Sequence, residues 1–254
     1  MFACEFKLFP RREIPIKDFV FDLWMFIGAL QKGGQITNED HVICGASCVR
    51  YACVCPEKKS LDPKHHSAHA RRAYEKLLKL CLRKPRVSVL GEMLDFSRAC
   101  DCKVRPFLVL FTHYLDSSSP VACGKCCRPV PLYQLPRPEI GAYDGLLRWQ
   151  KIYRNCDALF VSSQVGERFG NRQISGLQSE LTRLGRELCA SLEKRTALPV
   201  YYYLSRYYGT TARAESKRHC PGCRSKWLLN NPIWIFDFCC KSCRLLSSIA
   251  SDLR

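Results

Sequence analysis

The sequence lacks the short motifs that mark common phosphate, dinucleotide and hydrolase sites. None of G-x-x-x-x-G-K-[ST], G-x-G-x-x-G, G-x-S-x-G or H-E-x-x-H occurs in its 254 residues. It also lacks a repeat with a period of 20 to 50 residues and any long low-complexity tract. An enzyme is therefore the least supported class. A nuclease-type activity would depend on His65 and His66 beside Asp62, which could move protons on a phosphodiester.

Long hydrophobic runs are also missing. The longest N-terminal candidate, Phe19 to Leu30, is too short to span a bilayer and is interrupted by Asp22. Arg11 and Arg12 precede it, but no small-residue cleavage site follows. We therefore expect a buried amphipathic helix here, a cytoplasmic protein and no membrane partner.

Acidic residues are scarce relative to basic ones. The chain has 23 Asp and Glu against 40 Lys and Arg, a formal net charge of +17. Such a balance favours a polyanionic partner such as nucleic acid, although solubility is the alternative explanation. With 47% hydrophobic and 11% aromatic residues, the chain has enough apolar material for a packed core.

Cysteine, in contrast, is abundant, with 18 residues. A disulfide framework is typical of shorter secreted chains, so we expect reduced thiols and metal binding instead. The strongest pattern is Cys220-x2-Cys223 and Cys240-x2-Cys243, the paired spacing of a four-cysteine zinc site. Cys240 keeps this spacing, whereas Cys239 does not. Four thiolates leave no open coordination position, which predicts a structural Zn²⁺ site; iron in the same sulfur cage is the alternative.

Two further groups of possible ligands are less regular. A second four-sulfur site is predicted from the C-x-C and C-x2-C pairs Cys100, Cys102, Cys123 and Cys126, with Cys127 beside them. In a third group, two strand cysteines precede histidines at a helix start, and we expect structural roles: Cys53, Cys55, His65, His66 and His69.

The hydrophobic pattern predicts an α+β fold. Alternating strand and helix patterns over about residues 1–95 match a ferredoxin-like βαββαβ region. These elements are predicted at 2–10, 15–32, 41–56, 65–83 and 85–94. A helical middle section and a C-terminal zinc ribbon follow, which divides the chain into an α+β body (1–209), a linker (210–216) and the ribbon (217–254).

The middle section has its own pattern of elements. A strand is predicted at 106–115 and an extended proline-rich connector at 128–138. One helix begins at Asp144, and leucines at helical spacing predict another over 177–192. The aromatic stretch 199–209 reads as a strand, and some of its tyrosines should be exposed because alternate side chains face opposite sides.

Several segments resemble one bacterial protein family. These are CPGCRSKWLL and FDFCCKSCRLLSSIASD around the terminal cysteines, CPEKKSLDPKHHS at 55–67, the CDC group at 100–102, SPVACGKCCRPVPLYQLP at 119–136, and PVYYYLSRYYG at 199–209. The family carries the domain of unknown function 2310 and is described as zinc-ribbon-containing, with a conjectured role in nucleic-acid binding. The resemblance implies metal binding by both cysteine quartets, Cys220, Cys223, Cys240 and Cys243 together with Cys100, Cys102, Cys123 and Cys126.

These observations favour nucleic-acid binding, with RNA preferred over DNA. Basic residues of the ribbon would contact phosphates, and Trp227 would either stack on a base or pack in the ribbon core. The basic residues are Lys217, Arg218, Arg224, Lys226, Lys241 and Arg244. The alternative is a protein-interaction adaptor that docks on a ribosomal or transcription complex.

Overall fold

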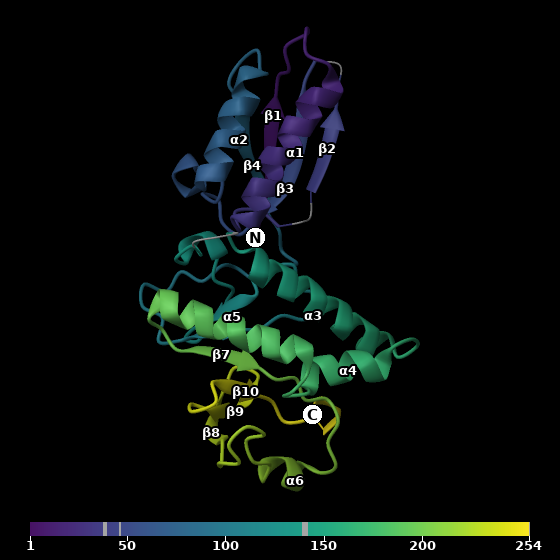
Figure 1. Cartoon of the computed structure of the whole chain (residues 1–254), viewed down its shortest axis with the longest axis vertical. Coiled ribbons are helices and arrows are strands. Elements are labelled where there is room, and N and C mark those ends of the chain that lie inside the picture. The colour runs from purple at the N-terminus through teal and green to yellow at the C-terminus, as the bar shows by residue number, and fades with distance from the viewer. Residues whose placement is uncertain (38–39, 46, 139–141, 254) are drawn as a thin grey trace. The chain divides into compact units, whose positions relative to one another are not determined.

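A computed structural model describes residues 1–37, 40–45, 47–138 and 142–253 and shows a mixed α+β fold (Figure 1). The chain forms two compact units. The N-terminal unit contains Met1–Ala99, Ser117–Ser119 and Arg128–Asp144; the C-terminal unit contains Cys100–Asp116, Pro120–Cys127 and Gly145–Arg254. No helix in the described part of the chain combines the length and the apolar character that a bilayer span requires.

The N-terminal unit is built on a four-stranded antiparallel sheet. In chain order its elements are β1 (Phe2–Leu8), α1 (Ile16–Lys32), β2 (Asp40–Cys44), β3 (Val49–Cys55), η1 (Pro63–His65), α2 (Ala68–Lys79), β4 (Arg86–Glu92) and η2 (Leu132–Gln134). The strand order is β2-β3-β1-β4, with every neighbouring pair antiparallel. This is the ferredoxin-like arrangement that the order of the sequence patterns predicts.

Helix α1 supplies the main apolar contact to this sheet. Its buried residues Phe19, Leu23, Phe26, Ile27 and Leu30 are those at helical spacing in the sequence. The Phe26 ring meets the Phe6 ring of β1 edge to face at 5.9 Å. The helix ends at Gly33 and Gly34, and Gly34 has a φ of 67° that favours glycine.

Helix α2 begins later than predicted, at Ala68 rather than His65. Ser67 is its N-cap, and the Ser67 hydroxyl accepts a hydrogen bond from the Ala70 amide. His65 lies in the separate short helix η1. The expected one-turn spacing of His65 and His69 on a common helix is therefore absent.

The C-terminal unit combines two long helices, α3 and α5, and the shorter α4 with a six-stranded sheet. Its elements are β5 (Leu108–Leu110), β6 (Val121–Cys123), α3 (Asp144–Ser162), α4 (Glu167–Ser175), α5 (Glu180–Thr196), β7 (Val200–Tyr203), α6 (Ala212–Ser216), β8 (Leu228–Ile233), β9 (Phe236–Cys240), β10 (Leu245–Ser247) and η3 (Ser251–Leu253). Strand β5 is shorter than the predicted 106–115, because the chain turns where the Asp116 amide donates to the His113 carbonyl.

The terminal strands belong to the same sheet as the strands of the middle section. The order is β6-β5-β7-β10-β9-β8, and β10 pairs with β7 in parallel. The six-stranded sheet thus crosses the predicted boundary at 217, and the predicted linker 210–216 contains α6. The physical reason is core size, since the terminal strands share the buried cluster of Tyr201 and Tyr203 with Phe236 and Leu246.

Strand β7 is buried on both faces, so its tyrosines are not exposed. Tyr202 lies against α3 and α5, where its ring is 5.9 Å from that of Trp149. Tyr201 and Tyr203 face the opposite side of the sheet and are also buried. The exposed tyrosines of this stretch are Tyr207 and Tyr208, which follow the strand.

Helix α5 approaches β7 closely at Gly185. A Cβ at this position would overlap the Tyr202 ring and lie 2.7 Å from Trp149 Nε1. We expect Gly185→Ala to destabilise the protein by about 1–3 kcal/mol, because overpacking outweighs the gain in helix propensity. Urea unfolding followed by circular dichroism measures the change.

The matched control for this substitution is Gly28→Ala in α1. A Cβ there meets nothing within 4 Å. It should stabilise the helix by about 0.5–1 kcal/mol. An equal stabilisation by both substitutions would contradict the close packing of α5 on β7.

Candidate metal centres

The terminal cysteines converge on one point. The Sγ atoms of Cys220, Cys223, Cys240 and Cys243 all lie within 4.8 Å of one another, and Cys223 Sγ is 3.5 Å from Cys240 Sγ. Cys240 is the last residue of β9, so this strand positions the first cysteine of the second pair. We call this set the terminal group.

Both turns of the terminal group have the backbone shape of a metal-binding knuckle. Arg224 and Arg244 each follow the second cysteine of a pair and adopt left-handed φ angles of 61° and 53°. The Cys243 amide donates to Cys240 Sγ at 3.4 Å. A Cβ on Gly222 would lie 2.8 Å from Cys243 Sγ, so the approach of the two pairs requires glycine.

A second set of sulfurs converges in the same unit. The Sγ atoms of Cys100, Cys102, Cys123 and Cys126 also lie within 4.8 Å of one another, and we call them the internal group. The Lys125 amide donates to Cys123 Sγ at 3.4 Å. The internal turn therefore also directs an amide at a sulfur, and the residue after its second cysteine is again left-handed, with a φ of 58°.

The crowded thiols have divergent proton affinities. Hydrogen bonds from Ser225 and then from neighbouring thiols lower the pKa of Cys223 to about 6. Burial, followed by the surrounding sulfurs, raises the pKa of Cys243 to about 12. In the internal group, burial opposes ionisation of Cys100, but bonds from Arg105 and the other cysteines bring its pKa to about 7. Cys223 and Cys100 are thus the more acidic thiols of their groups.

Each group could hold a metal ion. Sulfur donors suit soft ions, and four of them complete a tetrahedron. Such a centre orders the chain around it and leaves no position for a substrate. The neighbouring thiols of Cys127 and Cys239 lie outside both groups, which agrees with the choice of Cys240 over Cys239.

Several members of the third group, the two cysteines of β3 and His66 near α2, are buried in the N-terminal unit. Cys53 and Cys55 are buried in β3, with their sulfurs 3.9 Å apart. His66 is buried at 3% exposure between the rings of Phe26 and Tyr74, and burial lowers its pKa. His66 therefore has no access to a phosphodiester, which removes it from the nuclease hypothesis.

Four of the predicted phosphate-contacting residues are exposed around the terminal group. Within the described residues, no hydrogen bond or ion pair engages their side chains, so their charge is free to meet an anion. They are Lys217, Arg224, Lys226 and Lys241.

The structure corrects the predicted phosphate contact of Arg218 and selects the core alternative for Trp227. Trp227 is only 3% exposed, and its indole N–H donates to the Arg218 carbonyl at 2.9 Å. The Arg218 guanidinium lies over the Trp227 ring and 3.3 Å from a Glu215 carboxylate oxygen. Both side chains pack inside the unit because the small terminal sheet needs an aromatic core, and neither can contact a base or a phosphate.

The Arg244 side chain is also held by contacts within the unit. Its Nη2 lies 3.0 Å from Glu193 Oε1 on α5, and its Nη1 donates to the Lys241 carbonyl at 2.6 Å. The ion pair raises the pKa of Arg244 and lowers that of Glu193. Arg244 thus links the second knuckle to α5.

Among the tryptophans of the terminal strands, Trp234 is the exposed one in the described residues. It is 51% exposed in the turn between β8 and β9, with a left-handed φ of 55°. Its ring meets those of Phe111 and Phe236 edge to face at 5.2 and 5.6 Å. The Asn-Asn-Pro stretch before it lies within β8, so it does not mark this turn.

The fold and these two groups define an α+β protein with a ferredoxin-like N-terminal sheet and two four-cysteine candidate metal centres. Models of three domains match the chain: domains of unknown function DUF8589 at residues 1–91, DUF2310 at 102–205 and DUF8594 at 209–253. An uncharacterised protein of Haemophilus influenzae is 31% identical over 236 residues, covering 91% of this chain and 88% of the relative. The chain belongs to this DUF2310-containing family.

Other similarities are more limited. A second uncharacterised Haemophilus influenzae protein is 37% identical over 163 residues, which cover 64% of this chain and 80% of the relative. A crystal structure of an antibiotic biosynthesis monooxygenase has a TM-score of 0.29 and 10% identity over 37% of this chain and 99% of that chain. A conserved protein from Methanosarcina mazei Go1 has a TM-score of 0.30 and 14% identity, over 37% and 95% of the two chains. The matched descriptions assign no enzymatic activity to this chain.

Proposed function

We propose that this protein binds RNA through a basic surface ordered by a structural Zn²⁺ ion in the terminal group. The observation that carries the proposal is a set of four cations around the two terminal knuckles that are exposed and unpaired within the described residues. Their neighbours Arg218 and Arg244 are held in ion pairs, so the fold separates structural cations from available ones. Unpaired cations on a rigid surface are suited to phosphate contacts.

Zinc is the metal that these donors fit best. Four cysteine thiolates in paired C-x2-C turns, with amide N–H groups directed at sulfur, suit tetrahedral Zn²⁺. When bound, the ion would supply order and would neutralise part of the thiolate charge. Iron fits the same donors and would give a coloured protein, so the visible spectrum separates the two metals.

Single-stranded RNA is favoured because the hairpin of β8 and β9, whose second strand ends at Cys240, exposes an aromatic side chain at its turn. Trp234 is half exposed, and its edge-to-face contacts with Phe111 and Phe236 hold the ring in place. A fixed, exposed indole offers a face on which an unpaired base can stack. Trp234 thus takes the stacking role that the sequence suggested for Trp227.

The test is the salt dependence of RNA affinity. Fluorescence anisotropy with a single-stranded oligoribonucleotide should show steep weakening between about 50 and 200 mM salt. The triple variant Arg224→Gln, Lys226→Gln, Lys241→Gln should bind at least about tenfold more weakly and have a salt slope smaller by about 2–3. Trp234→Ala should weaken binding by about 1–3 kcal/mol and leave the slope unchanged.

The matched control removes the same charges from the N-terminal unit. Arg72→Gln, Lys79→Gln, Lys84→Gln replaces one arginine and two lysines that are exposed and unpaired in the described residues. Equal weakening by the two triple variants would reject a specific basic surface. If the wild-type protein shows no RNA binding, the proposal fails, and partners that survive nuclease treatment would favour the adaptor.

A further inference from the structure

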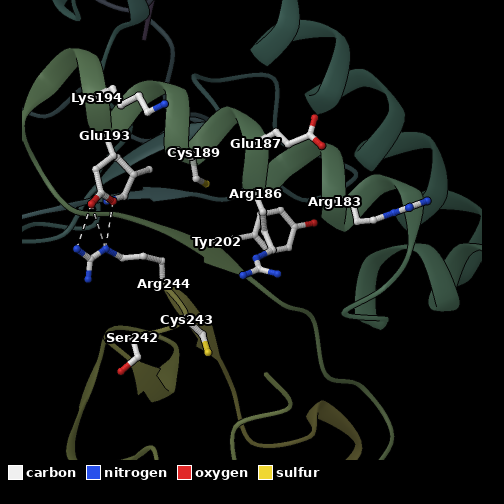
Figure 2. Close-up of a pocket in the computed structure, with 12 residues that line it drawn as sticks. Arg183, Arg186, Glu187, Cys189, Glu193, Lys194, Tyr202, Ser242, Cys243 and Arg244 are labelled. Atoms are coloured by element: carbon white, nitrogen blue, oxygen red, sulfur yellow. Dashed lines mark hydrogen bonds and ion pairs between the residues drawn. The ribbon is translucent and has the colours of Figure 1, made fainter. Parts of the chain in front are cut away.

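A cleft of about 600 Å³ lies in the C-terminal unit, between α5 and the second knuckle of the terminal group (Figure 2). Its lining includes four basic residues, Arg183, Arg186, Lys194 and Arg244, and two acidic ones, Glu187 and Glu193. The volume lies in the range typical of small-molecule sites. These six side chains together carry a net positive charge, and the Cys243 thiol of the terminal group also lines the cleft.

The two acidic residues do not cancel the charge of the four basic ones. Glu193 is occupied by Arg244, through contacts of 3.0 to 3.3 Å. Figure 2 shows Glu187 directed away from Arg244. Glu193 is therefore neutralised by its ion pair, and Glu187 is directed away from the knuckle side of the cleft.

The free cations are on α5. Within the described residues, no hydrogen bond or ion pair engages the side chains of Arg183, Arg186 or Lys194, and all three are exposed. Figure 2 shows Arg186 extending from α5 into the cleft, with Arg244 entering from the knuckle side. An unpaired guanidinium presents planar donors that match two oxygens of a phosphate group.

The floor of the cleft is neutral and apolar. Cys189 and Tyr202 are buried there, at 4% and 0% exposure. Burial raises the pKa of both side chains, so neither adds a negative charge at neutral pH. A low-polarity floor below unpaired arginines strengthens their attraction for an anion.

We propose that this cleft is a binding site for a phosphate group, carried by a ligand of nucleotide size, with Arg186 as its principal contact and Arg183 at its rim. The site is separate from the exposed knuckle cations and does not depend on the proposed RNA surface. The phosphate can come from a free nucleotide or from one residue of an RNA chain.

Calorimetric titration of the full, metal-loaded chain with uridine 5′-monophosphate and with inorganic phosphate tests the site. Both should bind wild-type protein at low salt. Arg186→Gln should weaken the binding by about tenfold or more, because a charge-assisted hydrogen-bonded pair is lost. Arg148→Gln on α3, an exposed arginine outside the cleft, is the matched control and should bind as the wild type does.

No binding of either probe to wild-type protein, or equal weakening by Arg186→Gln and Arg148→Gln, would overturn the proposal. Thermal melts of the variants exclude unfolding as the cause of any loss. Competition with a single-stranded oligoribonucleotide then assigns the source. Displacement of the mononucleotide by RNA supports a phosphate site on the path of an RNA chain, and independent binding supports a free nucleotide. Neither outcome of this competition depends on the triple variant that tests the RNA-binding surface.

Discussion

Replacement of Cys220 by serine should lower bound zinc from two ions per chain to one. Cys220 is buried in the terminal group, and a missing thiolate leaves a three-sulfur site. Structural zinc sites contribute about 10–16 kcal/mol of apparent binding free energy to folding, so loss of the ion should also disorder β8 to β10. Metal analysis by mass spectrometry and circular dichroism measure both effects.

The internal group provides the reciprocal experiment. Cys100→Ser should also leave one zinc ion per chain, now in the terminal group, and the double variant should bind none. Because the two groups share no ligand, the losses should add. Retention of two ions by either single variant would contradict a four-cysteine centre at that place.

Two neighbouring cysteines serve as controls. Cys239 precedes Cys240, and Cys127 follows Cys126, yet both lie outside the sulfur groups. Cys239→Ser and Cys127→Ser should therefore each retain two zinc ions. Lower pH should release the metal from all of these proteins, since protons compete for thiolate ligands.

Glu215→Ala should destabilise the C-terminal unit by about 3–5 kcal/mol, the cost of leaving a buried cation without its partner. Glu215 is 3% exposed on α6 and lies 2.6 Å from Arg206 Nη2 and 3.3 Å from Arg218 Nε. Arg218 is itself largely buried against two aromatic rings, and burial lowers its pKa. Without Glu215, no carboxylate of the described residues forms an ion pair with Arg218.

The matched comparison is the exposed pair of Arg98 and Glu92. Their closest contact is 2.7 Å, but both side chains reach solvent. Glu92→Ala should cost far less than Glu215→Ala, because solvent screens an exposed ion pair. Denaturant unfolding of the two variants measures the difference, and similar costs would show that Glu215 is not the organising charge of this region.

Much of the N-terminal unit could be predicted from the sequence. The apolar residues of α1 recur at helical spacing, and the order of strand and helix patterns is sufficient to suggest the ferredoxin-like arrangement. The start of α2 was wrong by three residues, because Ser67 is the better cap than the histidines before it.

The roles of individual side chains in the terminal strands were harder to predict. Trp227 and Trp234 are seven positions apart in the same basic, aromatic segment, and nothing local shows which one is buried. Trp227 is covered by Arg218, whereas Trp234 is placed in a turn. In the sequence, Arg183 and Arg186 are indistinguishable from ordinary exposed helix residues. Only the fold places the second knuckle opposite them.

The sequence by itself determined the two cysteine quartets, because ligand spacing within a turn is a local property that adjacent residues control. The excess of basic charge and the apolar faces of the helices are likewise properties of the sequence itself. Only the tertiary structure decided that the terminal strands extend the sheet of the middle section, which cations are paired, and where the cleft lies. Those features depend on contacts between residues far apart in the chain, such as Glu193 with Arg244, whose pairing requires the completed sheet.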